Sequence, residues 1–219
     1  VGMPIIAVVQ NKRRKMQYLP PKVSIEGHGI KRGLTAVEAA ILMEEPLDKI
    51  MTMILFGTLK KNAAEVITRE PLAIKSSDPL PAGLHEYESN FLKAFQEQKT
   101  KERQGLLQET MVSLVKSVSE KMRGFSRKET LDYYKSIMEK AWQQIESADT
   151  PEVKSQKFDE ALEWTMLDKE YDDRTRRTFR GPVYVPMWWG RYDPTYSSRP
   201  TQTGSGLPTS MTGQSTGRS

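Results

Sequence analysis

Residues 34–75 read LTAVEAAILMEEPLDKIMTMILFGTLKKNAAEVITREPLAIK, and the fold follows largely from this stretch. Thr35 and Glu38 stand three residues apart at the start of an apolar run. This is the spacing of a capping box, in which the two side chains bind free backbone amides at a helix start. The spacing predicts a short helix from Thr35 to about Met43.

A second helix is predicted over residues 46–61. Pro46 suits a first helical turn, because the amide hydrogen that proline lacks would have no partner there. Asp48 is favourable near the positive end of the helix dipole. Apolar residues recur at spacings of three and four, which predicts an amphipathic helix buried on one side. They are Leu47, Ile50, Met51, Ile54, Leu55 and Leu59.

After this helix the apolar pattern changes from a helical to an extended period. Residues 64–68 and 72–74 are rich in Val, Ile and Thr, and Arg69-Glu70-Pro71 separates them. This pattern is typical of a β-hairpin. Two helices followed by a hairpin give the element order of a winged-helix unit, which we place at residues 18–83. The proline-rich loop at 76–83 ends that unit.

The helix signals in residues 84–180 predict a helical bundle. One helix begins near His85, and Gly124 is suited to end a later one. Ser126, three residues before a glutamate, starts a further helix with a second capping box. Thr150 and Pro151 supply the N-cap and first residue of a last helix that runs to about residue 167. Beyond residue 168 we expect order to weaken.

The C-terminal part divides into two segments. Residues 181–193 include VYVPMWWGRY and form an aromatic docking segment, expected to be extended because prolines interrupt it. Residues 194–219 are mostly Ser, Thr, Gly, Pro and Gln, the composition of a disordered tail. The predicted fold class is therefore mainly α with a small β-hairpin (α+β): a winged-helix-like unit followed by a helical bundle and a disordered tail.

Residues 1–17 join an apolar run, VGMPIIAVV, to the cations Lys12, Arg13, Arg14 and Lys15. This order suits the cytoplasmic end of a transmembrane helix, because positive residues stay inside and attract anionic headgroups. We therefore expect sequence upstream of Val1 to supply a membrane segment. A short β-strand is the alternative, because the run is rich in Ile and Val and nine residues cannot span a bilayer. The four cations are a candidate site for an anionic surface.

Three stretches carry a resemblance: YLPP at residues 18–21, GIKRGLTAVEAA at 29–40, and LDKI with ILFG between 47 and 57. Together they resemble the cytosolic winged-helix-like region of a family of uncharacterised prokaryotic predicted membrane proteins. The resemblance implies a membrane-tethered cytosolic domain of unknown role, with a helix start, a second helix and a small hairpin. It implies no catalytic residues, and the family's membrane part is missing here.

The chain offers few groups for catalysis or metal binding. It has no cysteine and only two histidines, which excludes disulfides, thiolate metal sites and cysteine nucleophiles. It has no P-loop, GxGxxG, HExxH or GxSxG pattern. The acidic residues at 168–173 lack the glycine and terminal glutamate of an EF-hand loop. We predict that the protein is not an enzyme and has no cofactor and no metal site.

The net charge of +5 is compatible with nucleic acid or an anionic membrane, although many cytosolic proteins share it. Besides residues 12–15, a second basic run contains Arg174, Arg176, Arg177 and Arg180. Acidic residues directly precede this run. We therefore interpret it as a solvated mixed-charge turn.

The predicted function is a non-catalytic interaction or regulatory domain in the cytoplasm, at the cytosolic face of a membrane. The alternative is a winged-helix DNA-binding regulator, because such folds place a helix in the major groove. The second helix offers Lys49 and Thr52 as donors there, while Asp48 would repel phosphate. Nucleic acid is therefore the less favoured partner.

Trp188, Trp189 and Tyr192 allow two interpretations. They either dock on the helices as part of the core, or form an exposed anchor for an unidentified protein partner, since Trp and Tyr supply much of the energy at interfaces. The exposure of the two tryptophans discriminates between them. A homo-oligomer formed through the methionine-rich second helix or the bundle is a further candidate assembly.

Overall fold

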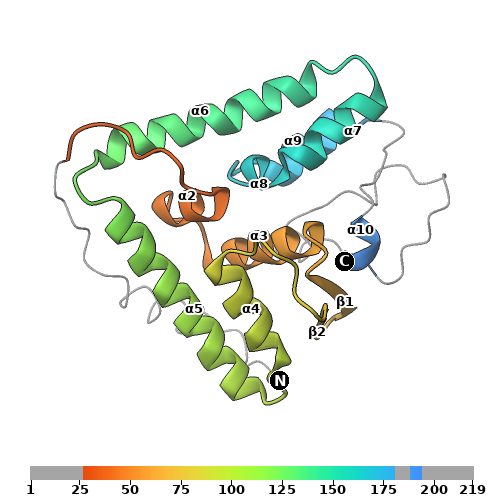
Figure 1. Cartoon of the computed structure of the whole chain (residues 1–219). Coiled ribbons are helices and arrows are strands. Elements are labelled where there is room, and N and C mark those ends of the chain that lie inside the picture. Colours follow the sequence, from red (N-terminus) through yellow and green to blue (C-terminus); the bar gives the residue numbers. More distant parts are fainter. Residues whose placement is uncertain (1–26, 181–187, 194–219) are drawn as a thin grey trace, which may run out of the picture.

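The computed structural model describes residues 27–180 and 188–193, and within these ranges the chain forms nine helices and one two-stranded antiparallel hairpin (Figure 1). This confirms the prediction of a mainly helical fold with a small hairpin. The basic run at residues 12–15 and the predicted tail at 194–219 lie outside the described residues.

Helix α2 (Ala36–Leu42) begins with the predicted capping box. The backbone amide of Glu38 donates to Thr35 Oγ1 at 3.2 Å, and the amide of Thr35 donates to Glu38 Oε2 at 2.9 Å. These bonds satisfy two of the amides that a helix start leaves without partners. The prediction made from the Thr-x-x-Glu spacing is confirmed.

Helix α3 (Leu47–Lys60) is the centre of the fold, and the prediction that it is buried on one side only is wrong. Every residue from Thr52 to Leu59 is buried. Helices α2 and α4, strand β1, the short helix α8 (Leu162–Thr165) and the last helical turn all contact it. The helix is therefore covered on several sides by elements from distant parts of the chain.

The polar residues of α3 are buried as well. Lys49 binds Glu45 at 3.0 Å and the backbone carbonyl of Asp168 at 3.1 Å. The Thr52 hydroxyl donates to the carbonyl of Asp48 at 2.8 Å. With 8% and 2% of their surfaces exposed, Lys49 and Thr52 are not presented to a DNA groove.

Strands β1 (Ala64–Arg69) and β2 (Leu72–Ser76) form the predicted hairpin. Ala64 pairs with Ser76 at its base, and a bulge at Ile67 shifts the register near its tip. Strand β2 packs on α4 (Glu86–Gln96) and β1 on the turn formed by residues 189–192. The hairpin thereby joins two later segments to α3.

The later helices form two pairs. Helix α4 packs on α5 (Thr100–Lys121), and α6 (Arg127–Glu146) packs on α7 (Pro151–Glu160). Figure 1 shows α5 and α6 diverging from their shared turn, with α2 between them. Helix α2 contacts both. The arrangement differs from four adjacent helices because α2 and α3 occupy the space between the two pairs.

The predicted ends of these helices are confirmed. Gly124 adopts a φ of +79° just beyond α5, a conformation that favours glycine. The Ser126 hydroxyl accepts from the amide of Glu129 at the start of α6. Thr150 caps α7 in the same way, with Pro151 as the first helical residue. The predicted second capping box is incomplete, because the amide of Ser126 donates to the carbonyl of Gly29 and not to the Glu129 side chain.

The structure corrects two predictions about residues 151–180. The last predicted helix is broken at Ala161 into α7 and α8. Order also continues beyond Asp168, because α9 (Tyr171–Thr178) is a helix with Tyr171 and Phe179 in the core. Ion pairs of Arg174 with Glu139 and Glu146 hold α9 against α6.

Residues 189–192 also differ from the prediction. The segment was expected to be extended, but Trp189–Tyr192 form a single helical turn, α10. Residues 181–187, which contain the two prolines used in that prediction, lie outside the described residues.

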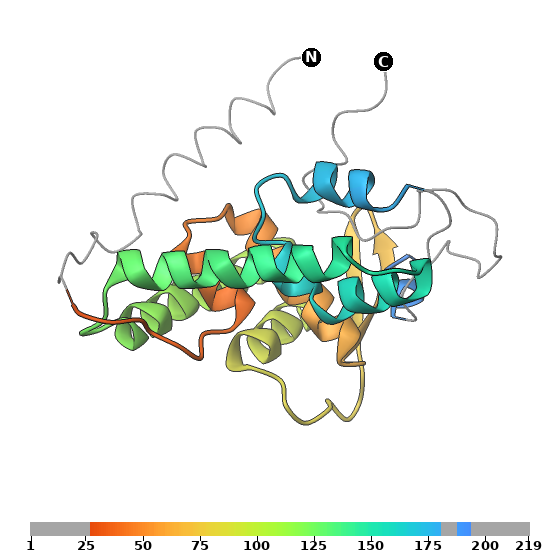
Figure 2. The same ribbon diagram turned by 90° about the horizontal axis from the view of Figure 1, so that it is seen from above.

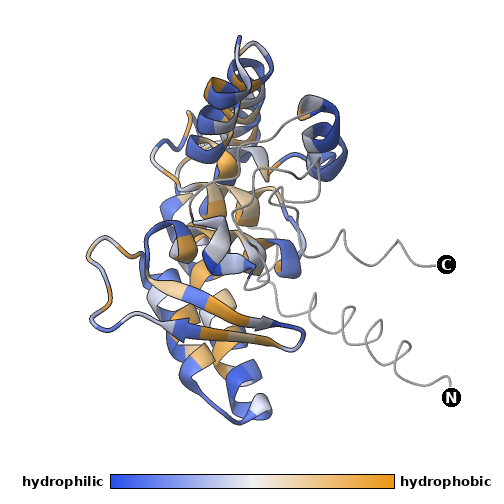
Figure 3. Ribbon diagram, turned by 90° about the vertical axis from the view of Figure 1, so that its right-hand side faces the viewer, coloured by the Kyte–Doolittle hydropathy of each residue, from blue (hydrophilic) through white to orange (hydrophobic). Residues whose placement is uncertain are grey.

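One hydrophobic core joins all these elements. It contains buried residues of α2, α3 and the hairpin together with residues of every later helix pair. Figure 3 shows the apolar residues on the ribbons in the middle of the molecule and mostly hydrophilic residues at the outer end of the α4–α5 pair. The loop at residues 77–84 therefore does not separate two cores.

Candidate functional site

Residues 27–35, which we call the entry strap, lie across the α5–α6 turn and along the first half of α6 (Figure 2). The backbone amide of Ser126 donates to the carbonyl of Gly29 at 2.9 Å. The amide of Lys31 donates to Thr130 Oγ1 at 2.9 Å. These bonds join residues about a hundred positions apart in the chain.

Tyr134 provides the second attachment of the strap. Its hydroxyl accepts from the amide of Leu34 at 2.8 Å and donates to the carbonyl of Lys31 at 3.1 Å. Burial raises the pKa of this hydroxyl, so it stays protonated and can act as both donor and acceptor. Thr130 and Tyr134 lie one turn apart on the buried face of α6.

The strap approaches the α5–α6 turn so closely that only glycine fits. A Cβ atom at Gly27 would lie 2.3 Å from the carbonyl carbon of Gly124. Real Cβ atoms do not make such contacts, so any larger residue would displace the strap or the turn. Glycine at position 27 therefore allows the strap to meet the α5–α6 turn at this point.

We call the entry strap and the α5–α6 turn together the entry corner. Cationic side chains lie on both parts of it. The Lys31 ammonium lies 5.1 Å from the ring centre of Phe125, and the Arg32 guanidinium 5.6 Å from that of Tyr133. Arg32 is exposed. Such contacts hold a cation at the surface without neutralising it.

The entry corner has a surplus of one positive charge when the paired acids Glu38 and Glu44 are counted with it. Residues 27–33 and 120–133 carry six cationic and three acidic side chains. Of the six cations, Lys121 pairs with Glu38 and Arg127 with Glu44. The other four make no ion pair with any residue in the described ranges; they are Lys31, Arg32, Arg123 and Lys128.

The basic residues predicted to bind an anionic surface cannot be placed relative to this corner. Lys12, Arg13, Arg14 and Lys15 lie outside the described residues. They precede the entry strap in the chain, which joins the body at the entry corner. The corner cations were not foreseen, although the Gly-Ile-Lys-Arg-Gly pattern at residues 29–33 places two of them between glycines.

The aromatic residues predicted as docking elements or anchors are buried. Trp188 and Trp189 are each 4% exposed and Tyr192 is 1% exposed. All three rings pack around Phe56 of α3. Their burial fits the docking interpretation and leaves none of these rings free to act as an exposed anchor.

The interpretation of the second basic run as a solvated turn holds only in part, because Arg174, Arg176 and Arg177 lie on helix α9 and Arg174 is largely buried. Arg174 binds carboxylates of Glu139, Glu146 and Asp168 and lies 4.9 Å from the ring centre of Trp142. The hydrogen bonds that the guanidinium donates to these acids, above all to Glu146, raise its pKa. Arg176 and Arg177 instead make exposed ion pairs within their own segment.

A buried polar junction joins α3, α4 and α8. Glu88 accepts from Lys61 Nζ at 2.6 Å and from the backbone amide of His85 at 2.7 Å. Burial raises the pKa of the nearby Glu163 carboxyl. Both carboxylates lie over Gly57, where a Cβ atom would be 2.9 Å from Glu88 Oε1 and 3.3 Å from Glu163 Oε1. The glycine makes room for this junction.

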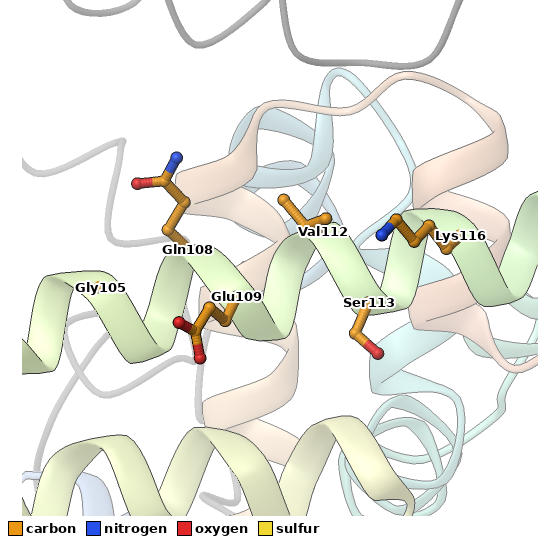
Figure 4. Close-up of a pocket in the computed structure, with 6 residues that line it drawn as sticks. All are labelled: Gly105, Gln108, Glu109, Val112, Ser113 and Lys116. Carbon is orange, nitrogen blue, oxygen red and sulfur yellow. The ribbon is translucent and has the colours of Figure 1, made fainter.

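Two surface hollows offer little for catalysis. The residues of one, from Gly105 to Lys116, all lie on α5, so it is an open helix face (Figure 4). The other lies between α6, α7 and α9, where acids already balance Arg174. Within the described ranges, no three His, Asp or Glu side chains are grouped to hold a metal ion.

None of the helices in residues 27–180 and 188–193 is long and apolar enough to cross a membrane. Comparison of the chain with family models, curated proteins and solved structures finds no match. The resemblance seen over residues 18–75 therefore stays a prediction.

Proposed function

We propose that this protein is a non-catalytic interaction domain that rests on an anionic membrane surface through its entry corner. The observation that supports the proposal is the location of the unpaired cations. Lys31 and Arg32 lie on the strap, and Arg123 and Lys128 flank Ser126, which binds the strap. The basic run at residues 12–15 precedes the strap in the chain.

Cations contribute most to membrane binding when they lie on the same side of the domain. Each Lys or Arg near an anionic leaflet contributes about 1 kcal/mol, and the attraction fades within a Debye length of about 10 Å. Charges scattered over a domain therefore add little to binding. Lys31 and Arg32 lie on the strap, Arg123 lies in the α5–α6 turn and Lys128 in the first turn of α6, and backbone bonds hold the strap against this turn. We infer that these four cations can approach a surface together.

In this proposal, helices α2 and α3 with the hairpin form a winged-helix-like unit whose role is packing. Helix α3 supplies the centre of the core, and the hairpin holds α4 and α10 against it. Upstream sequence would tether the chain, and the domain would act at the cytosolic face of the membrane.

The test is co-sedimentation of the full chain with phosphatidylcholine vesicles, with and without phosphatidylglycerol. We expect binding only to the anionic vesicles, and weaker binding as salt is added. The double variant Arg123→Glu/Lys128→Glu should bind at least roughly tenfold more weakly, because each lost cation is worth about 1 kcal/mol.

The matched control is Lys93→Glu/Lys101→Glu, which makes the same charge change beside the α4–α5 turn. Lys93 lies near the end of α4 and Lys101 at the start of α5, roughly 30 Å along α5 from Arg123. Both lysines are exposed and make no ion pair with a described residue. Equal losses in the two double variants, or no binding to anionic vesicles, would refute the proposal. Salt-sensitive binding to duplex DNA without vesicle binding would support the DNA-binding alternative instead.

A further inference from the structure

Residues 188–193 form a small unit that packs against the rest of the protein and connects to α9 only through residues 181–187. Figure 1 shows α10 beside α3 and the hairpin, away from α9. Its contacts are with α3 and β1. One helical turn has almost no stability of its own in water. Its conformation therefore depends on the surface that receives it.

That surface is centred on Phe56, which lies between three aromatic rings. The ring centres of Trp188, Trp189 and Tyr192 lie 5.5, 6.1 and 5.0 Å from that of Phe56. The Tyr192 and Trp189 rings meet Phe56 edge-on, the geometry that aromatic pairs prefer. We call the surface of α3 and β1 around Phe56 the aromatic groove.

Polar contacts at one side of the groove define the orientation of the segment. The indole N–H of Trp188 donates to the carboxylate of Asp159 on α7. The guanidinium Nε of Arg191 donates to the backbone carbonyl of Leu59, in the last turn of α3, at 3.1 Å. A cation is favourable there because the helix dipole is negative at its C-terminal end.

Arg69 of β1 completes the groove at its other side. Its guanidinium lies 4.8 Å from the ring centre of Tyr192 and 3.4 Å from the Tyr192 hydroxyl. It also pairs with Asp193 at 3.8 Å. Five of the six residues in the segment therefore have a defined partner on the groove, and the sixth is glycine.

We propose that the aromatic groove is a recognition site for a short Trp-Trp-Gly-Arg-Tyr-Asp segment. The chain fills this site with its own residues 188–193, and a second copy of the chain can also supply the segment. The contacts belong to side chains of the segment and not to its covalent connection. The same segment presented in trans meets the same partners, so two copies can exchange it.

Effective concentration determines which segment occupies the groove. A segment attached by a short linker competes at a millimolar effective concentration. In the wild-type chain the attached segment therefore excludes a free one. Weakening the attached segment opens the groove to a segment added in trans.

The test uses a fluorescent capped peptide, WWGRYD, and the full chain. The variant Trp188→Ala/Trp189→Ala should bind the peptide at least roughly tenfold more tightly than wild type does, because its own segment competes poorly. A scrambled peptide should not bind. Fluorescence anisotropy gives the affinities, and circular dichroism confirms that the variant is folded.

Arg69→Ala in the same background should weaken peptide binding by about fivefold or more, because it removes the contacts to Tyr and Asp of the peptide. The control is Lys75→Ala on the adjacent strand. The Lys75 side chain is 72% exposed, and its ion-pair partner among the described residues is Glu65. A folded variant that does not bind the peptide, or that binds the scrambled peptide equally, overturns the proposal.

A second measurement covers the case in which the double alanine variant does not fold. The peptide then carries a photo-crosslinking residue at its glycine and is added in excess to the single variant Arg191→Ala, whose attached segment is weakened by loss of its bond to the carbonyl of Leu59. The proposal expects crosslinks on α3 and β1 next to Phe56 and Arg69. Crosslinks confined to other surfaces overturn it.

Discussion

Replacing Tyr134 with phenylalanine tests how the entry strap is held. The substitution removes one hydroxyl and leaves the ring, which stacks on Trp164 with a centre-to-centre distance of 5.7 Å. The strap thereby loses a donor to the carbonyl of Lys31 and an acceptor for the amide of Leu34. Tyr134 is 1% exposed, so water does not readily replace the hydroxyl.

The expected cost follows from the buried amide. A typical hydrogen bond contributes about 1 kcal/mol, and a buried donor left without a partner costs about 1–3 kcal/mol. We expect the free energy of unfolding to fall by about 2 kcal/mol. For a domain of this size, that corresponds to a decrease in Tm of about 4–8 °C.

The assay is urea unfolding at neutral pH, followed by tryptophan fluorescence and circular dichroism. The matched control is Tyr133→Phe at the neighbouring position, whose hydroxyl has no hydrogen bond to a described residue. We expect that variant to lie within about 0.5 kcal/mol of wild type. Equal stability of the two variants would refute the conclusion that the Tyr134 hydroxyl fixes the strap.

Two further predictions concern charged groups. Arg174→Ala should lower the free energy of unfolding by about 2–3 kcal/mol, because three carboxylates and the Trp142 ring lose a largely buried cation. The control is Arg176→Ala at an exposed ion pair, which should change the free energy of unfolding by less than about 0.5 kcal/mol in the same urea assay. Glu163→Gln should raise stability at neutral pH, because burial raises the pKa of this carboxyl and the folded wild-type protein carries the cost of its charge there. The contribution of Glu163 to wild-type stability is greatest below its ordinary pKa of 4.5 and falls as pH rises through the folded-state pKa. The stability advantage of the glutamine variant should therefore vanish in acid. An advantage that does not change with pH in urea titrations would contradict the conclusion that it comes from the buried charge.

The local elements of the fold were predictable because their signals lie within a few residues of each other. Thr35 and Glu38 fix a helix start through bonds that span three positions. The change from helical to extended spacing after Lys61 similarly marks the hairpin. These features depend on short-range geometry, which the sequence displays directly.

The burial of α3 was not predictable in this way. Thr52 and Lys49 look like surface residues, but the hydroxyl of Thr52 binds a carbonyl of its own helix and Lys49 reaches a carbonyl at position 168. Burial of such residues depends on partners far away in the chain. Arg174 shows the same limit, since its acids lie up to 35 positions earlier.

The candidate site was predictable only in part. The sequence indicated that an anionic surface was the favoured partner, but it located the cations at residues 12–15. The entry corner combines Lys31 and Arg32 with Arg123 and Lys128, which are about ninety positions away in sequence. Hydrogen bonds between the strap and Ser126, Thr130 and Tyr134 bring the two groups together.

The entry strap also bears on the order in which the chain can reach its native state. As a ribosome delivers the chain from its N-terminus, residues 27–35 emerge about a hundred positions before the α6 side chains that receive them. Contacts of such wide separation form slowly, because the intervening loop must first be closed. The earliest described part of this protein is therefore completed late, and nascent chains that end before Ser126 lack all the residues that bind the strap on this side.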